Sequence, residues 1–299
     1  SAVPHHRVPR VRDHEILNLM LWLLRIAQEP MGGRRLRSFF TALQFLTRIH
    51  LVEQRDLTAA DFGRSTRCFP LVGAVLGALY LLAAWLLGAW RGGVSHTGAA
   101  VLVLLPILLT GGLHCDGFMD TVDGLFSGRS RTRMLEIMKD SRTGSFGVVA
   151  FGVCLLLDWS LMLDLLAASA VLLPALFLMP VVGRMAMVHA IACFPYARPE
   201  GMGKAFAAAA DGRTRGIAAV TAALCILPWG PLPLLLSLAA LFVATLFDRY
   251  AASKLGGLTG DVYGATEKLT ETLLLLLFWG AAVFWGSAPF LKGWLLLWN

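Results

Sequence analysis

Long apolar runs, interrupted by short polar segments, make up most of this chain of 299 residues. A helix that crosses the hydrocarbon core of a bilayer needs about 20 predominantly apolar residues, and it satisfies its own backbone polar groups. The pattern therefore predicts an all-α, polytopic membrane bundle of about seven transmembrane helices. These are expected at residues 68–90, 97–113, 146–163, 167–189, 216–230, 231–247 and 272–291.

The fifth and sixth runs are short, and only the segment WGPLP at 229–233 separates them. They are either two full spans or a re-entrant hairpin. Either arrangement leaves the flanking loops on the same side of the membrane.

Composition supports a membrane protein, because 57% of the residues are hydrophobic and 15% are charged. A soluble domain has about 25% charged residues. We expect residues 31–299 to form a single membrane-embedded catalytic domain. Residues 1–30 precede Met31 and contain only a short apolar stretch, so they are expected to be an N-terminal extension outside the core. A surface-lying amphipathic helix is the alternative for this extension.

Basic residues concentrate in alternate connections between the expected spans. The first connection holds only Arg91, and the third and fifth hold no Lys or Arg, whereas the second, fourth and sixth hold five, four and three. The positive-inside rule then places the amino end and these three connections in the cytoplasm. The polar clusters that can carry chemistry therefore lie at the cytoplasmic ends of the helices. The net charge of +7 is consistent with an anionic lipid surface and phosphate-rich ligands.

Three aspartates follow the second apolar run, in the segment GGLHCDGFMDTVDGLFSG at 111–128. Asp116, Asp120 and Asp123 are spaced four and three apart, so on a helix they fall within an arc of roughly 60°. Grouped carboxylates repel one another unless a cation neutralises them, and oxygen ligands favour Mg²⁺ or Mn²⁺. We expect a catalytic metal site here. The alternative is a solvated helix whose acids interact with its dipole.

His114 is a further candidate catalytic residue in this segment. It lies about 160° from Asp116 on an ideal helix, so it shares the aspartate face only if the helix begins after it. An ordinary interfacial histidine is the alternative.

The next segment, RSRTRMLEIMKDSRTGSFG at 129–147, combines basic side chains with flexible glycines. Such a loop can donate to a diphosphate, and Asp140 is a candidate fourth metal ligand. The alternative is a basic loop that only follows the positive-inside rule. The candidate substrate-binding residues of this segment are Arg129, Lys139, Ser141 and Arg142.

A third cluster, GGLTGDVYGATEKLTE at 256–271, precedes the last apolar run. Asp261 and Glu267 are candidate substrate-binding residues, and the glycines permit close approach of a ligand. Acids that cap a helix in a glycine-rich turn are the alternative. Arg184, inside the fourth span, is expected to face the same site, because an arginine in a span faces a cavity or a partner. Arg198, Lys204 and Arg213 either bind an anionic ligand or anchor their loop.

These segments together resemble the cobalamin synthase family, whose members are adenosylcobinamide-GDP ribazoletransferases. The resemblance covers about residues 37 to 280 and includes FFTALQFLTRI, CFPLVGAVLGAL and YARPEGMGKAF besides the aspartate and glycine segments. The pattern HxDGxxDTxDG followed by MKDSRxG carries most of its specificity. Cys115 and Met119 depart from the family's usual residues, but neither departure affects a carboxylate.

The resemblance implies a Mg²⁺-dependent phosphotransferase of the bacterial inner membrane. Such an enzyme joins the cobinamide phosphate of adenosylcobinamide-GDP to α-ribazole or its 5′-phosphate and releases GMP. Asp116, Asp120 and Asp123 are then the metal-binding acids, with Asp140 and Asp261 as further candidates. The sequence leaves open a homo-oligomer or a complex with other cobalamin-assembly enzymes, and no nucleic-acid partner is expected.

Two other functions are alternatives to this one. A phosphotransferase that joins a nucleotide-activated alcohol to a lipid usually carries DGxxAR, and DGFMDT at 116–121 lacks the Ala–Arg pair. A cation or corrinoid transporter predicts acids at mid-span. The only acids deep in an apolar run, Asp158 and Asp164, are expected near the external end of the third span.

Overall fold

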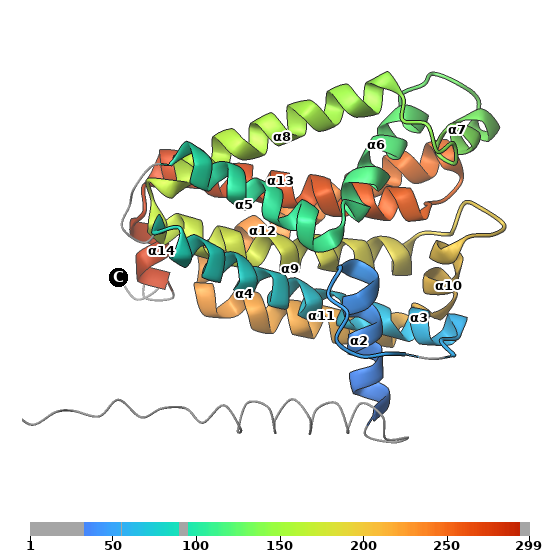
Figure 1. The fold of residues 1–299 in the computed structure, drawn as a ribbon, viewed down its shortest axis with the longest axis horizontal. Coiled ribbons are helices and arrows are strands. Elements are labelled where there is room, and N and C mark those ends of the chain that lie inside the picture. The colour runs from blue at the N-terminus through green and yellow to red at the C-terminus, as the bar shows by residue number, and fades with distance from the viewer. Residues whose placement is uncertain (1–32, 55, 90–94, 294–299) are drawn as a thin grey trace, which may run out of the picture.

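The computed structural model describes residues 33–54, 56–89 and 95–293, and the secondary-structure elements of these residues are all helices (Figure 1). The expected extension at 1–30 and Arg91 lie outside the described residues. The first helices are α2 (Gly33–Leu46), α3 (Ala59–Ser65), η1 (Thr66–Cys68), α4 (Phe69–Leu86), α5 (His96–Thr110), α6 (Leu113–Leu125) and α7 (Arg131–Ile137). They are followed by α8 (Ser145–Leu166), α9 (Ser169–Cys193), α10 (Met202–Ala209), α11 (Gly212–Ile226), η3 (Leu227–Trp229), α12 (Pro231–Leu255), α13 (Gly260–Trp285) and α14 (Ala288–Lys292).

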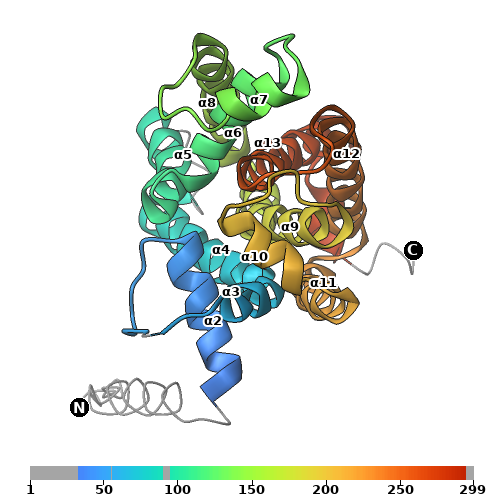
Figure 2. The same ribbon diagram turned by 90° about the vertical axis from the view of Figure 1, so that its right-hand side faces the viewer.

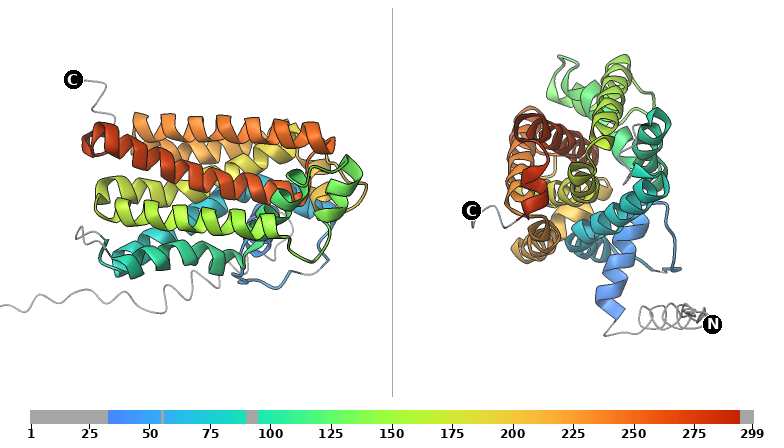
Figure 3. Two further views of the ribbon diagram at one scale, coloured as in Figure 1. Left: turned by 90° about the horizontal axis from the view of Figure 1, so that it is seen from above. Right: turned by 90° about the vertical axis from the view of Figure 1, so that its left-hand side faces the viewer.

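The long helices run side by side, and most of the short ones gather at one end of the bundle, whereas α14 lies at the opposite end (Figures 1 and 3). The end with most of the short helices carries α3, α6, α7 and α10 together with the start of α13. It is formed by the connections that the basic residues predicted to be cytoplasmic. The all-helical membrane fold predicted from the apolar runs is confirmed, whereas the side of the membrane on which this end lies stays a prediction.

Helix length limits how many of the expected spans can cross a membrane unaided. By length and composition, five described stretches qualify: α8, α9, α12, α13 and the continuous stretch Ala59–Leu86 that contains α4. A sixth qualifies if α5 and α6, which meet at an angle of 91°, count as one broken span. α11 has 15 residues, so it is shorter than a typical span, whereas α12 has 25.

α9 is the central helix of the bundle, and the other long helices surround it in the end-on view (Figure 2). In its apolar stretch 89% of the residues are buried, compared with 28% in α8 at the periphery. Gly73 and Gly77 let α4 approach α9 closely, because a Cβ at these positions would lie 2.4 Å from the Pro180 carbonyl oxygen and 2.5 Å from that of Phe177. Small residues at such crossings are typical of helix pairs in membranes.

The last long helix begins earlier than the apolar pattern indicated. α13 starts at Gly260 and not at residue 272, with Thr259 as its N-cap. Glu267, Lys268 and Glu271 are therefore inside the bundle. The sequence argument that Asp158 and Asp164 are the only acids deep in an apolar segment is corrected by this placement.

These interior charges are paired with partners on neighbouring helices. Arg184 of α9 forms ion pairs with Glu267 and Glu271, and Lys268 pairs with Asp158 of α8. Because a charge buried without a partner is costly in a low dielectric, this interior ion network joins α8, α9 and α13 in one relative position.

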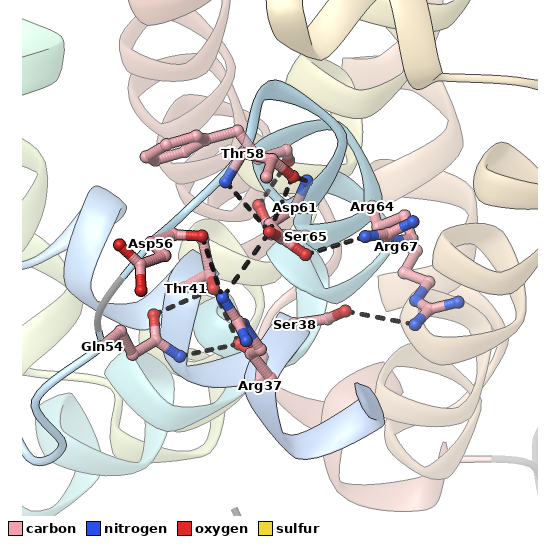
Figure 4. A network of polar contacts seen from close by, with 11 residues as sticks. Arg37, Ser38, Thr41, Gln54, Asp56, Thr58, Asp61, Arg64, Ser65 and Arg67 are labelled. Carbon is pink, nitrogen blue, oxygen red and sulfur yellow. Dashed lines mark hydrogen bonds and ion pairs between the residues drawn. The ribbon is translucent and has the colours of Figure 1, made fainter. Parts of the chain in front are cut away.

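A polar network fixes the first helices at the end of the bundle where the short helices gather (Figure 4). The Gln54 side chain accepts from Thr41 and donates to the Arg37 carbonyl oxygen, so the loop after α2 folds back onto that helix. Arg37 lies 3.7 Å from Asp61, the acid in the capping box of α3. α2 and α3 are thereby held together beside α10.

Candidate functional site

A sharp turn places α6 across the end of the bundle. Gly111 and Gly112 both adopt the left-handed conformation, with φ of 65° and 77°, between α5 and α6. Glycine takes this conformation without the steric penalty that other residues meet. The turn directs the chain out of the line of α5, so that α6 presents its residues at the surface where the short helices gather.

The three aspartates of α6 have different surroundings. Asp116 is exposed, Asp120 is half-buried and Asp123 is buried. The two carboxylate oxygens of Asp123 accept hydrogen bonds from the backbone N–H groups of Gly144 and Gly147, at 2.7 and 2.9 Å. Asp123 therefore caps the amino end of α8, where a carboxylate also interacts favourably with the helix dipole.

His114 lies on the inner side of α6, away from Asp116. α6 begins at Leu113, so the condition under which His114 would share the aspartate face is not met. Its ring is 3% exposed and Nδ1 is 3.9 Å from Glu267 of α13. Among the described residues neither ring nitrogen has a hydrogen-bond partner.

α6 and α13 approach each other closely enough for their backbones to touch. A Cβ at Gly117 would lie 2.7 Å from the Asp261 carbonyl oxygen, and one at Gly264 would lie 3.4 Å from the Cα of His114. This crossing brings Asp261, at the start of α13, to the aspartates of α6. The sequence predicted Asp261 as a site residue from its motif alone. The structure brings the backbone of Asp261 against α6 at Gly117.

Asp120 is surrounded by other acids, since Asp116, Asp123 and Asp261 all act on its carboxylate electrostatically. We call Asp116, Asp120 and Asp261 the acidic cluster. Arg198, from the loop before α10, lies 2.9 Å from Asp261. One guanidinium therefore faces several carboxylates, and the cluster keeps an excess of negative charge that favours a bound cation.

Two hollows are lined by residues of the acidic cluster, and a third is connected to it through Arg198. The phenylalanine cavity, of about 250 Å³, is lined by Phe45, Phe69 and Phe206 and reaches Asp116 and Asp261. The Arg48 groove, of about 590 Å³, lies on the other side of Asp116 and is lined by Gln44, Arg48, His50 and the Gly111–Gly112 turn. The α7 groove, of about 640 Å³, is lined by the basic residues Arg131, Lys139 and Arg198 together with two acids, Glu136 and Glu200.

The predicted substrate-binding residues fall into three groups. Lys139 lines the α7 groove and Asp261 lines the phenylalanine cavity. Arg184 and Glu267 are instead fully buried in the interior ion network and line none of these three hollows. Their observed contacts hold α9 against α13.

Arg129, Ser141 and Arg142 are exposed on the loops around α7. Arg142 engages both oxygens of Asp140, and these hydrogen bonds lower the pKa of that carboxyl to about 2. Asp140 is therefore ionised throughout the neutral range. Its described partner is Arg142 and not a member of the acidic cluster.

Several residues that line the hollows were missed or left undecided by the sequence. Arg48 and His50 directly follow an apolar helix, and this polar ending in FLTRIH was the one signal for them. Arg198 was weighed equally as an anchor. The phenylalanine cavity had no local signal, because its three rings come from α2, α4 and α10.

Comparison with known proteins is consistent with this site. The model of the cobalamin-5-phosphate synthase family matches residues 38–279. The chain belongs to this family. The match extends from α2 into α13 and includes the whole acidic cluster and all three hollows' charged residues. No solved structure matches the chain.

Relatives with assigned names resemble the chain over nearly their full length. The adenosylcobinamide-GDP ribazoletransferase of Desulfitobacterium hafniense (strain Y51) is 43% identical over 249 residues, which is 81% of this chain and 96% of the relative. The protein of the same name from Clostridium acetobutylicum is 33% identical over 253 residues, or 84% and 98% of the two chains. That of Escherichia coli (strain K12) is 37% identical over 246 residues, or 80% and 97%.

The acidic cluster has the donor chemistry that a hard divalent cation requires. Its carboxylate oxygens come from two helices, and oxygen donors are those that Mg²⁺ prefers. Within residues 33–54, 56–89 and 95–293, no three His, Cys, Asp or Glu side chains are arranged around one metal position. The residues fit such an ion as a partial ligand set, of the kind that Mg²⁺ completes with water and substrate phosphates.

Proposed function

We propose that this protein is an adenosylcobinamide-GDP ribazoletransferase. It transfers the cobinamide phosphate of adenosylcobinamide-GDP to α-ribazole or α-ribazole 5′-phosphate, forms adenosylcobalamin or its 5′-phosphate, and releases GMP. Membership of the cobalamin-5-phosphate synthase family is the observation that carries the proposal. The acidic cluster beside a basic groove suits a reaction at a diphosphate.

The reaction breaks the phosphoanhydride bond of the diphosphate and forms a phosphoester bond to α-ribazole. A hydroxyl of α-ribazole attacks the phosphate attached to cobinamide, the new P–O bond forms, and the bond to the GMP phosphate breaks. The hydroxyl proton passes to a carboxylate of the acidic cluster, and GMP departs with the bonding electron pair. His114 is the alternative acceptor named by the sequence, but its ring is buried on the inner side of α6.

The α7 groove is the proposed site of the diphosphate. Arg131, Lys139 and Arg198 line it, and cationic donors of this kind form charge-assisted hydrogen bonds to phosphate oxygens. Arg131 packs against the turn at Gly256 that leads into α13, since a Cβ there would lie 2.5 Å from its Cζ. The groove is therefore held next to Asp261.

Mg²⁺ is the proposed cofactor, and two carboxylates from among Asp116, Asp120 and Asp261 would hold it as a partial ligand set, which leaves the third to accept the hydroxyl proton. When bound, the ion neutralises charge on the phosphate oxygens and on the departing GMP. Asp123 and Asp140 were predicted as ligands too. Their described contacts give Asp123 the task of capping α8 and pair Asp140 with Arg142.

We further propose that the protein lies in the bacterial inner membrane with the acidic cluster in the cytoplasm. The clustering of Lys and Arg in the connections at this end of the bundle supports that orientation. Adenosylcobinamide-GDP and α-ribazole would then reach the site from the cytoplasm.

An assay with the purified membrane protein tests the proposed activity. The full chain in lipid nanodiscs is supplied with Mg²⁺, adenosylcobinamide-GDP and α-ribazole, and GMP and the corrinoid product are quantified by chromatography. Equal amounts of both products are expected. CMP release from a cytidine-activated alcohol and a lipid, without GMP release, would support the lipid phosphotransferase instead. Corrinoid movement across the bilayer without product would support a transporter.

A further inference from the structure

The phenylalanine cavity is a largely apolar pocket, open to the surface, next to the acidic cluster. Phe45, Phe69 and Phe206 form part of its wall, and Met187 and Ile191 of α9 close it from the bundle interior. Its mouth is at the surface, where Asp116 and Met202 are exposed. The cavity therefore offers an apolar compartment whose rim carries carboxylates.

Aromatic rings from three helices build the wall. The Phe206 ring centroid of α10 lies 4.7 Å from that of Phe45 and 5.8 Å from that of Phe69. Phe62 of α3 packs on the outer side of Phe206, at 6.0 Å, and does not line the cavity. Aromatic walls of this kind bind flat aromatic ligands through offset or edge contacts.

Two buried residues of the lining have polar atoms without partners. Within the part of the chain that the structure describes, neither ring nitrogen of His114 nor the hydroxyl group of Tyr263 has a hydrogen-bond partner. His114 and Tyr263 are 3% and 2% exposed. Because these polar atoms are themselves buried, a ligand in the cavity would reach one of them after its side chain turns toward the cavity.

We propose that the phenylalanine cavity binds the benzimidazole ring of α-ribazole, an inference that rests on the proposed function. The bicyclic ring is flat and apolar, and its one unsubstituted ring nitrogen accepts the hydrogen bond that His114 or Tyr263 can donate. The attached ribose then extends through the mouth toward Asp116 and Asp261. This places its hydroxyl groups beside the acidic cluster.

The other parts of the substrates fit this cavity less well. At about 250 Å³ it is smaller than the roughly 300–1,000 Å³ pockets that hold drug-sized ligands, so a corrin ring is excluded. A guanine ring carries several donors and acceptors that phenylalanine, methionine and isoleucine side chains would leave unpaired. The α7 groove, in which three basic residues outnumber two acids, is the better site for the guanosine diphosphate.

Substitutions at the cavity test which of the two substrates it binds. Phe206→Ala removes one wall, and Met202→Trp narrows the mouth at an exposed position that folding tolerates. Phe62→Ala is the matched control, since it removes a ring from the same aromatic cluster outside the cavity. Each variant is assayed as the full chain in nanodiscs for the KM of both substrates and, by calorimetry, for the Kd of α-ribazole alone.

We expect Phe206→Ala and Met202→Trp to raise the KM and Kd for α-ribazole at least about tenfold, which corresponds to about 1.4 kcal/mol. The KM for adenosylcobinamide-GDP stays within about twofold, and Phe62→Ala changes neither value beyond that margin. If Phe206→Ala fails to fold, Met202→Trp decides the question.

Equal effects on both substrates, a selective effect on adenosylcobinamide-GDP, or no effect in folded variants would overturn the assignment. The binding measurement tests the assignment of the cavity independently of the proposed transferase activity. Wild-type protein that binds α-ribazole through this cavity but releases no GMP would contradict the transferase activity alone.

Discussion

Asp116 and Asp123 lie on the same helix and carry the same functional group, but their surroundings differ. Asp116 is exposed at the mouth of the phenylalanine cavity, whereas Asp123 is buried and caps α8 through Gly144 and Gly147. The four-and-three spacing predicted their common face. It could not reveal the cap, because Gly144 reaches Asp123 only after the loop around α7 has folded.

Substitution of the two residues should therefore have different consequences. Asp123→Ala removes a helix cap and is expected to lower the free energy of unfolding by about 1 kcal/mol, within a range of about 0.5–2. Asp116→Ala removes no described hydrogen-bond partner and should leave stability nearly unchanged while GMP release falls. Thermal unfolding of both variants in detergent, alongside the transfer assay, checks the contrast. An Asp116→Ala protein less stable than Asp123→Ala would contradict it.

Among the helices, the crossing of α6 and α13 brings the residues of the acidic cluster together. The apolar pattern predicted most of the long helices, but it placed the start of α13 at 272, since Glu267, Lys268 and Glu271 interrupt the apolar run. Those residues are buried because Arg184 and Asp158 come from distant positions in the chain. Local sequence carries no information about such partners. The early start of α13 brings Asp261 to α6.

A methyl group at the crossing should separate the two helices. Gly117→Ala would place a Cβ 2.7 Å from the Asp261 carbonyl oxygen, and overpacking of this kind costs about 1–3 kcal/mol. We expect a lower melting temperature and reduced GMP release. Gly216→Ala in α11 is the matched control, because among the described residues no neighbouring side chain or helix lies within 4 Å of the position that its new methyl group would take. Alanine is also the better helix former there. Equal effects of the two substitutions would show that the close crossing is unimportant.

The interior ion network connects α8, α9 and α13. Arg184→Ala leaves Glu267 and Glu271 buried without their arginine, and breaking a buried pair in this way costs about 3–5 kcal/mol. We expect a large loss of stability in detergent. Arg184→Lys keeps the charge and should restore part of it. Denaturant unfolding compares the variants, and an Arg184→Ala protein as stable as the wild type would refute the role of the network.

In the whole molecule, the long helices surround α9, and one end of the bundle carries the acidic cluster and the three hollows. Composition and apolar length predicted this class of fold, and the basic connections identified which loops meet at that end. The number of spans was less predictable, because α5 and α6 form a bent pair and α11 is short. The cavity and the grooves arise where several helices meet, so they belong to the assembled bundle and to no single segment.

We propose that the acidic cluster performs Mg²⁺-dependent transfer of the cobinamide phosphate. Asp120→Asn, which keeps the size of the side chain, tests it most directly when GMP release is measured against Mg²⁺ concentration. Asp211→Asn is the control, because Asp211 is an exposed N-cap of α11 and asparagine caps equally well. We predict that Asp120→Asn lowers the rate by about 100-fold or more with an unchanged melting temperature, while the control retains wild-type activity. Full Mg²⁺-dependent transfer by Asp120→Asn would contradict the account.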